Sequence, residues 1–223
     1  MTYIALILSV LIGIFIVFGL KPSNQFAKLL LAFSGAYLLS ITILHLFPEV
    51  YASEVSNIGL FILIGLLFQL ILDFFSKGAE HGHIHIKKDM VFPWALFISL
   101  SIHAFMEGIP LAHNHHHEYL LWAIVVHKIP IAVILGTFFV NSKIPKSKAV
   151  LFLLLFSLMS PLGSLAGENV QILTLYKTEI TAVIIGIFLH ISTIILFETS
   201  KDHTFNLLKF VAILVGMFVA FLA

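Results

Sequence analysis

The chain has 223 residues, of which 60% are hydrophobic and 10% are charged, and its formal net charge is +1. A soluble domain carries about 25% charged residues and a disordered one has low hydrophobicity, so this composition excludes both classes. Cysteine is absent, which excludes disulfides and thiolate ligands, and the near-neutral charge gives no indication of nucleic-acid binding.

Long apolar runs divide the chain into eight predicted membrane-spanning helices. Each run is near 18 residues or longer with few charges, which is the length that crosses a bilayer as a helix. None shows the alternation of a membrane β-strand, so the sequence predicts an all-α integral membrane protein with a single domain over residues 1–223. The spans are about 3–20, 29–48, 55–72, 90–112, 119–140, 149–167, 180–197 and 205–223.

The lysines predict the orientation of these spans, because cytoplasmic loops carry an excess of positive charge. Lysine supplies all 12 basic residues of the chain. With eight spans, ten of them fall on one side of the membrane, only Lys177 falls on the other, and Lys128 lies within a span. We therefore predict that the side with ten lysines is cytoplasmic and that both termini are extracytoplasmic.

The second span ends in ILHLFPEV, which contains the first pair of polar residues within a predicted span, His45 and Glu49. A charge near the middle of a bilayer costs roughly 2.5–3.5 kcal/mol on insertion scales, so such residues usually face a cavity or each other. This pair lies near the end of its span. An entrance to a pathway and a structural or solvated pair are therefore both open.

Two histidine runs lie in loops on either side of the fourth span. The loop over residues 77–89 is predicted to be cytoplasmic, and a second run follows the outer end of the span. Closely spaced neutral imidazoles capture metal ions loosely. Neither run defines a coordination geometry, so a solvated polar loop is the alternative. The histidines are His81, His83, His85, His113, His115, His116 and His117.

The fourth and fifth spans, with SIHAFMEGIP and VVHKIPIA, give the strongest functional signal. His103 and Glu107 are four residues apart, so they share one face of a helix. Imidazole nitrogen and carboxylate oxygen are ligands for divalent transition metals such as zinc or iron, and His127 on the next helix could complete the set. Pro110 and Pro130 each lie three residues after one of these ligands and free a backbone carbonyl there. We predict a metal site within the membrane.

The motifs of this chain, taken in order, resemble those of the ZIP (Zrt-/Irt-like) family of metal-ion transporters. HLFPE closes the second span, HAFMEG lies in the fourth, HKIP in the fifth, SPLG in the sixth and GIFLH in the seventh. A histidine-rich loop between the third and fourth spans is also typical of the family. The resemblance implies a three–two–three plan, in which the first and last triplets are related as an inverted repeat and enclose the fourth and fifth helices.

The resemblance also implies roles for the polar residues. His103, Glu107 and His127 would be the primary ligands of a transported ion. The outer histidine run would lie toward the outer face, and the run in loop 77–89 would receive metal on the cytoplasmic side. His190, in the seventh span, is open between a pathway role and a packing role. Two residues at the outer mouth would accompany the outer histidines: His45 and Glu49.

The chain departs from the family pattern beside the predicted ligands. Ala104 and Ile131 stand where many members have ligating side chains, and Lys128 stands where several have an acidic or amide ligand. A lysine ammonium there could pair with Glu107 and occupy the neighbouring metal subsite. We therefore predict one metal ion per site, with water, Met106 or a freed carbonyl completing its shell.

The resemblance implies a transporter, and not an enzyme, that moves a divalent transition-metal ion into the cytoplasm by alternating access. Zinc is the first expectation, with Fe²⁺, Mn²⁺ or Cd²⁺ as alternatives, and the ion is substrate rather than cofactor. The expected partners are the ion and the lipid bilayer, and the expected location is the plasma membrane. Whether two copies form a homodimer is left open. A metal-sensing or non-transporting relative remains an alternative. A membrane di-iron enzyme is disfavoured, because the fourth span separates the two histidine runs.

Overall fold

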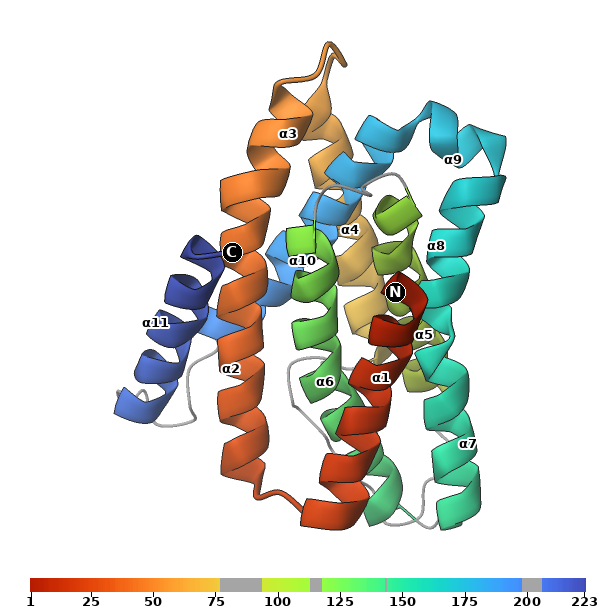
Figure 1. The fold of residues 1–223 in the computed structure, drawn as a ribbon, viewed down its shortest axis with the longest axis vertical. Helices are drawn as coiled ribbons and strands as arrows, with labels where there is room; N and C mark the ends of the chain where they lie inside the picture. The colour runs from red at the N-terminus through yellow and green to blue at the C-terminus, as the bar shows by residue number, and fades with distance from the viewer. Residues whose placement is uncertain (77–93, 113–117, 143, 198–205) are drawn as a thin grey trace.

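The computed structural model describes residues 1–76, 94–112, 118–142, 144–197 and 206–223, and every regular element in these ranges is a helix (Figure 1). A bilayer offers no partner to a free backbone group, so apolar segments satisfy their N–H and C=O groups within helices. The predicted all-helical class is confirmed for these residues. The elements are α1 (Thr2–Phe15), η1 (Ile16–Leu20), α2 (Asn24–Ile41), η2 (Thr42–Leu46), α3 (Phe47–Tyr51), α4 (Ile58–Ser76), α5 (Trp94–Gly108), η4 (Ile109–Ala112), α6 (Glu118–Asn141), α7 (Lys146–Ser157), α8 (Met159–Asn169), α9 (Gln171–Leu175), α10 (Lys177–Phe197) and α11 (Leu207–Phe221).

Within the described part of the chain, seven helices are long and apolar enough to cross a membrane, counted with the short segments that continue them. The helix α11 is also apolar but has 15 residues, fewer than the roughly 20 that a bilayer requires of an untilted helix. The chain is therefore a multi-pass membrane protein. The seven spans are Thr2–Leu20, Asn24–Tyr51, Ile58–Ser76, Trp94–Ala112, Glu118–Asn141, Lys146–Asn169 and Lys177–Phe197.

The helices pack in two groups that meet along α5 and α6. In one group α4 lies along α10 and α2 along α11, and in the other α1 lies along α6 and α5 along α8. Contacts of α2 with α6 and of α4 with α5 join the two groups. Figure 1 shows α11 at one edge of the bundle beside α2, with α7 and α8 at the opposite edge. The central helix is α6, because 78% of its apolar window is buried, against 28% for the spans that contain α1 and α4.

Glycines allow α5 and α8 to approach each other closely. A Cβ added at Gly108 would lie 2.1 Å from the carbonyl oxygen of Ser160, and one added at Gly163 would lie 2.0 Å from that of Phe105. Because the interior is close-packed, neither position can take a larger residue unless a backbone moves. This contact holds α8 against the helix that carries two of the three predicted ligands.

Local irregularities occur in the helices that carry the predicted polar residues. The helix α5 stops before Pro110, and the chain continues as the 3₁₀ segment η4. In contrast, α6 stays helical on both sides of Pro130. At the end of α2, the segment η2 is π-helical, and the N–H of Phe47 bonds to the carbonyl of Thr42 five residues back. The two prolines expected to disturb their helices therefore act differently, and a third irregularity lies at His45.

Candidate metal centre

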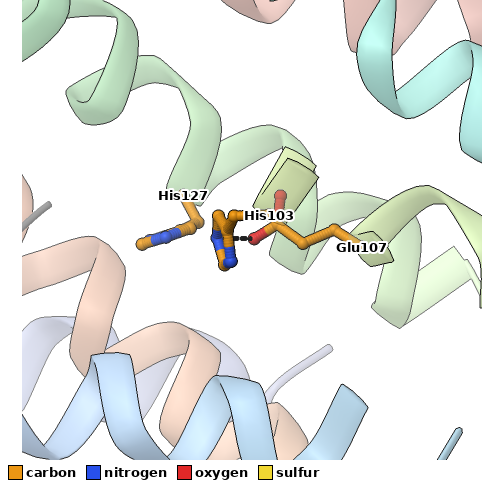
Figure 2. A group of neighbouring side chains, drawn as sticks. All are labelled: His103, Glu107 and His127. Atoms are coloured by element: carbon orange, nitrogen blue, oxygen red, sulfur yellow. Dashed lines mark ion pairs between the residues drawn. The ribbon is translucent and has the colours of Figure 1, made fainter. Parts of the chain in front are cut away.

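Three buried side chains from α5 and α6 converge inside the bundle (Figure 2). One ligand atom from each of His103, Glu107 and His127 lies within 4.8 Å of the other two. The Nε2 of His103 is 2.8 Å from Oε1 of Glu107, and the two imidazole rings meet edge to face with centroids 6.3 Å apart. All three residues are at most 2% exposed. We call this group the buried cluster.

The buried cluster offers two nitrogen ligands and one oxygen ligand. Zinc in proteins binds such atoms at about 2.0–2.2 Å, and imidazole and carboxylate ligands also suit iron and manganese. The three atoms lie within 4.8 Å of one another, which is close enough for all three to contact one ion. Three protein ligands leave a coordination position for water, which allows an ion to exchange. The buried cluster is therefore a group of side chains that could hold a metal ion.

Lys128 lies beside the buried cluster and contacts its carboxylate. Its Nζ is 3.7 Å from Oε2 of Glu107 and donates a hydrogen bond to Oγ of Ser160 on α8. That hydroxyl donates in turn to the carbonyl oxygen of Ala104, at 2.5 Å. Lys128 is 1% exposed, and its ammonium also lies 5.3 Å from the centre of the Phe156 ring. One oxygen of Glu107 thus faces a histidine while the other faces a lysine.

A residue that the sequence interpretation missed, Gln69 on α4, also contacts the cluster. Its Oε1 lies 3.1 Å from Nδ1 of His103, and the side chain is fully buried. A signal for it was present, because Gln69 is the one polar side chain in the apolar stretch 58–72 and such residues usually face the protein interior. Ser160 was part of the SPLG motif, but its contact with Lys128 depends on how α6 and α8 pack.

The structure places His190 away from the buried cluster, next to a carboxylate of α4. Its Nε2 lies 4.0 Å from Oδ2 of Asp73, and the side chain of Asp73 is 20% exposed. Asp73 follows Gln69 by four residues, so the two lie one helical turn apart. Polar groups of α4 and α10 therefore continue from the cluster toward the end of α4 at Ser76.

His45 and Glu49 lie near the end of the bundle where α3 is found, and both contact the first turn of α6. The ring of His45 stacks on that of Tyr119, with centroids 4.5 Å apart, and the hydroxyl of Tyr119 donates to Oε2 of Glu49 at 3.1 Å. Glu49 is exposed and His45 is partly exposed. We call these three residues the end cluster.

The remaining predicted residues stay predictions. Met106 is partly buried and packs against the hydrophobic core. Among the described residues, the group that brings three potential ligands together is the buried cluster. The histidines of the two loops lie outside the described residues: His81, His83, His85, His113, His115, His116 and His117.

The fold and the buried cluster together define a multi-pass α-helical membrane protein whose interior holds a group of side chains that could bind a metal ion. A sequence model described as the ZIP zinc transporter family matches residues 76–223, which is more than half of the chain and includes the whole buried cluster. The chain belongs to this family, and the resemblance drawn from its motifs is confirmed. Members of the family are transporters, which agrees with the expectation of a transport protein rather than an enzyme.

One similar protein is protein zntD from Dictyostelium discoideum. It is 28% identical to this chain, and the matched region covers 63% of this chain. The same region is 24% of protein zntD, so this chain spans about a quarter of that relative's length.

Proposed function

We propose that this chain carries a divalent transition-metal ion through the membrane into the cytoplasm by alternating access, with zinc as the first cargo and iron or manganese as alternatives. The observation that supports this most strongly is the buried cluster, whose three ligand atoms lie within 4.8 Å of one another on residues at most 2% exposed. Ionisable side chains inside a membrane bundle commonly mark an ion pathway. Family membership supports transport as the activity.

The proposed site takes one ion, bound by His103, Glu107 and His127. The second oxygen of Glu107 is 3.7 Å from Nζ of Lys128, so an ammonium stands where a second cation would otherwise approach the carboxylate. The opposite charges of Glu107 and Lys128 also offset each other. The ligand set then holds a cation less tightly than an unpaired carboxylate would. A transport site must bind well enough to load and weakly enough to release, and this charge balance suits both.

We propose eight spans in a three–two–three plan, with α11 as the eighth and both termini outside a plasma membrane. The lysine distribution supports this orientation, and a tilt or local thinning of the bilayer accommodates a short span. A cysteine introduced by Thr2→Cys should then react with a membrane-impermeant reagent added to intact cells. Protection of that cysteine, with labelling after permeabilisation, would reverse the topology.

The proposed route of the ion runs from the end cluster, through the buried cluster, to the far end of α4. His45 and Glu49 are accessible and offer ligands at the outer mouth. Beyond the buried cluster, Asp73 and His190 lie 4.0 Å apart and offer the next carboxylate and imidazole. The histidine-rich loop would receive the ion on the cytoplasmic side through His81, His83 and His85.

Uptake of Zn²⁺ into proteoliposomes, with Fe²⁺, Mn²⁺ or Cd²⁺ as competitors, tests transport and selectivity together. His103→Ala should reduce uptake to background, while Ser34→Ala, which removes a fully buried hydroxyl on α2, should leave it near the wild-type rate. Unchanged uptake by His103→Ala would remove the site assignment. Wild-type protein that binds zinc without moving it would favour the non-transporting alternative.

A further inference from the structure

Gln69, on α4, makes a hydrogen bond to His103 on α5. Its Oε1 lies 3.1 Å from Nδ1 of His103, while Nε2 of the same ring lies 2.8 Å from Glu107. A carbonyl oxygen can only accept, so Nδ1 must carry the hydrogen of this bond. The imidazole is therefore held by one nitrogen while the other is turned toward the carboxylate of the buried cluster.

The tautomer of His103 decides whether it can bind an ion there. A neutral imidazole has one N–H donor and one nitrogen lone pair. When Nδ1 carries the hydrogen, the lone pair is on Nε2, on the side of Glu107 and His127. Ligating histidines in metal sites commonly have their second nitrogen held in this way, which sets the ring orientation and raises the basicity of the ligand.

We propose that Gln69 is a positioning residue for metal binding, which selects the His103 tautomer whose Nε2 faces the ion. This rests on the proposed transport site. Gln69 does not touch the ion itself, since its Oε1 is engaged at Nδ1. Its position on a different helix from all three ligands makes binding depend on the contact between α4 and α5 as well as on α5 and α6.

The chemistry of an amide also suits a site that must release its ion. A carboxylate in this position would accept the same hydrogen bond and would add a negative charge near the cation. It would raise the basicity of Nε2 further and hold the ion more tightly. Gln69 therefore orients His103 without adding to the charge of the site, which favours turnover over tight binding.

Two substitutions at position 69 should change zinc affinity in opposite directions. Gln69→Leu removes the hydrogen-bond acceptor of His103. It should weaken zinc binding by roughly 10–100-fold, the usual effect of removing the hydrogen-bond partner of a metal-binding histidine. Gln69→Glu keeps the acceptor, and it should tighten binding and lower the maximal uptake rate. The Kd is measured on purified protein by competition with a chromophoric chelator, and KM and maximal rate by Zn²⁺ uptake into proteoliposomes.

A role in packing alone would give a different result. Both variants would then lose folded protein and maximal rate in parallel, while the Kd of the protein that remains folded would not change. The Ser34→Ala control should keep both its Kd and its maximal rate near the wild-type values. That outcome, or a Gln69→Leu variant with wild-type affinity, would overturn the proposal. If Gln69→Leu does not fold, the unbranched Gln69→Met replaces it. His103→Ala with normal binding would instead refute the transport site itself, so the two failures are distinguishable.

Discussion

Two pairs in this chain share one spacing, a histidine followed four residues later by a glutamate, and their structures differ. In α5, Nε2 of His103 lies 2.8 Å from Oε1 of Glu107, and both residues are 2% exposed. At the end of α2, His45 stacks on Tyr119, and Glu49 accepts a hydrogen bond from the same tyrosine. The first pair is shielded and joined by a further ligand from α6, whereas the second lies where water can reach it.

The backbone explains part of this difference. His103 and Glu107 lie in a regular α-helix, where residues four apart share a face. His45 lies in the π-helical segment η2, whose hydrogen bonds connect residues five apart and so change the angle between His45 and the residues after it. Pro48 then lies in the first turn of the short helix α3, and Glu49 is directed to a tyrosine of α6.

The spacing of a histidine and a glutamate does not by itself define a metal site in this chain. A charge buried in a membrane protein needs partners, and Glu107 has an imidazole on one side and an ammonium on the other. The carboxylate of Glu49 is exposed and can be hydrated instead. We therefore expect the buried cluster to control ion binding and the end cluster to have a smaller influence.

The same substitution in both clusters should give the largest contrast. Glu107→Gln removes a ligand charge and leaves Lys128 buried without its counter-charge, so zinc uptake should fall to background. Glu49→Gln keeps an acceptor for Tyr119 at an exposed position, where charge pairs contribute little, and should retain roughly half of the uptake or more. Radiolabelled zinc uptake per reconstituted protein measures both. Equal losses would contradict the distinction between the clusters.

The buried cluster should also depend on the close contact of α5 and α8, which the end cluster does not share. Gly163→Ala forces a methyl group toward the carbonyl of Phe105, where the Cβ would be 2.0 Å away. Such overpacking typically costs about 1–3 kcal/mol, so the melting temperature in detergent and the zinc uptake should both fall.

The matched control for this glycine is Gly59, at the start of α4 near the end cluster. A Cβ there would lie 3.6 Å from its nearest neighbour, the hydroxyl of Tyr51. Gly59→Ala should leave the melting temperature unchanged or slightly higher, because alanine favours a helix over glycine by about 1 kcal/mol. A Gly163→Ala protein as stable and active as Gly59→Ala would show that α8 can move without harm to the site.

A third substitution tests the charge balance that separates the two clusters. Lys128→Met removes the ammonium 3.7 Å from Glu107 while keeping much of the side-chain volume. Zinc should then bind roughly tenfold more tightly, a change of about 1.4 kcal/mol, and the maximal uptake rate should fall because release is slower. Lys148→Met, at an exposed position on α7, is the control. Weaker zinc binding by Lys128→Met would reject this role for the lysine.

The membrane class and the His103–Glu107 pair could be predicted from the sequence because each depends on local chemistry. The length of an apolar run is itself the requirement for crossing a bilayer, and helical periodicity brings residues four apart onto one face. Membership of the ZIP family followed from motifs that appear in order along the chain.

The partners of the buried cluster could not be predicted, because they depend on how distant helices pack. Gln69 and His103 are 34 residues apart in sequence, and Lys128 and Ser160 are 32 apart. No local pattern pairs them, although each is a polar residue in an apolar helix. The π-helical turn at His45 likewise leaves no clear mark in the sequence. From the sequence, His45 and Glu49 are therefore equally consistent with the entrance to a pathway and with a solvated pair.

The smallest expected effect belongs to the hydrogen bond that holds the end cluster together. Tyr119→Phe removes the hydroxyl that donates to Glu49 at 3.1 Å but keeps the ring that stacks on His45. At an exposed carboxylate, water replaces the lost donor, and a typical hydrogen bond contributes only about 0.5–1.5 kcal/mol net. The KM for zinc uptake should therefore change by less than roughly twofold, and Tyr119→Ala, which also removes the ring, should change it more. A loss in Tyr119→Phe as large as that in Glu107→Gln would contradict this minor role and would give the hydroxyl of Tyr119 a direct part in transport.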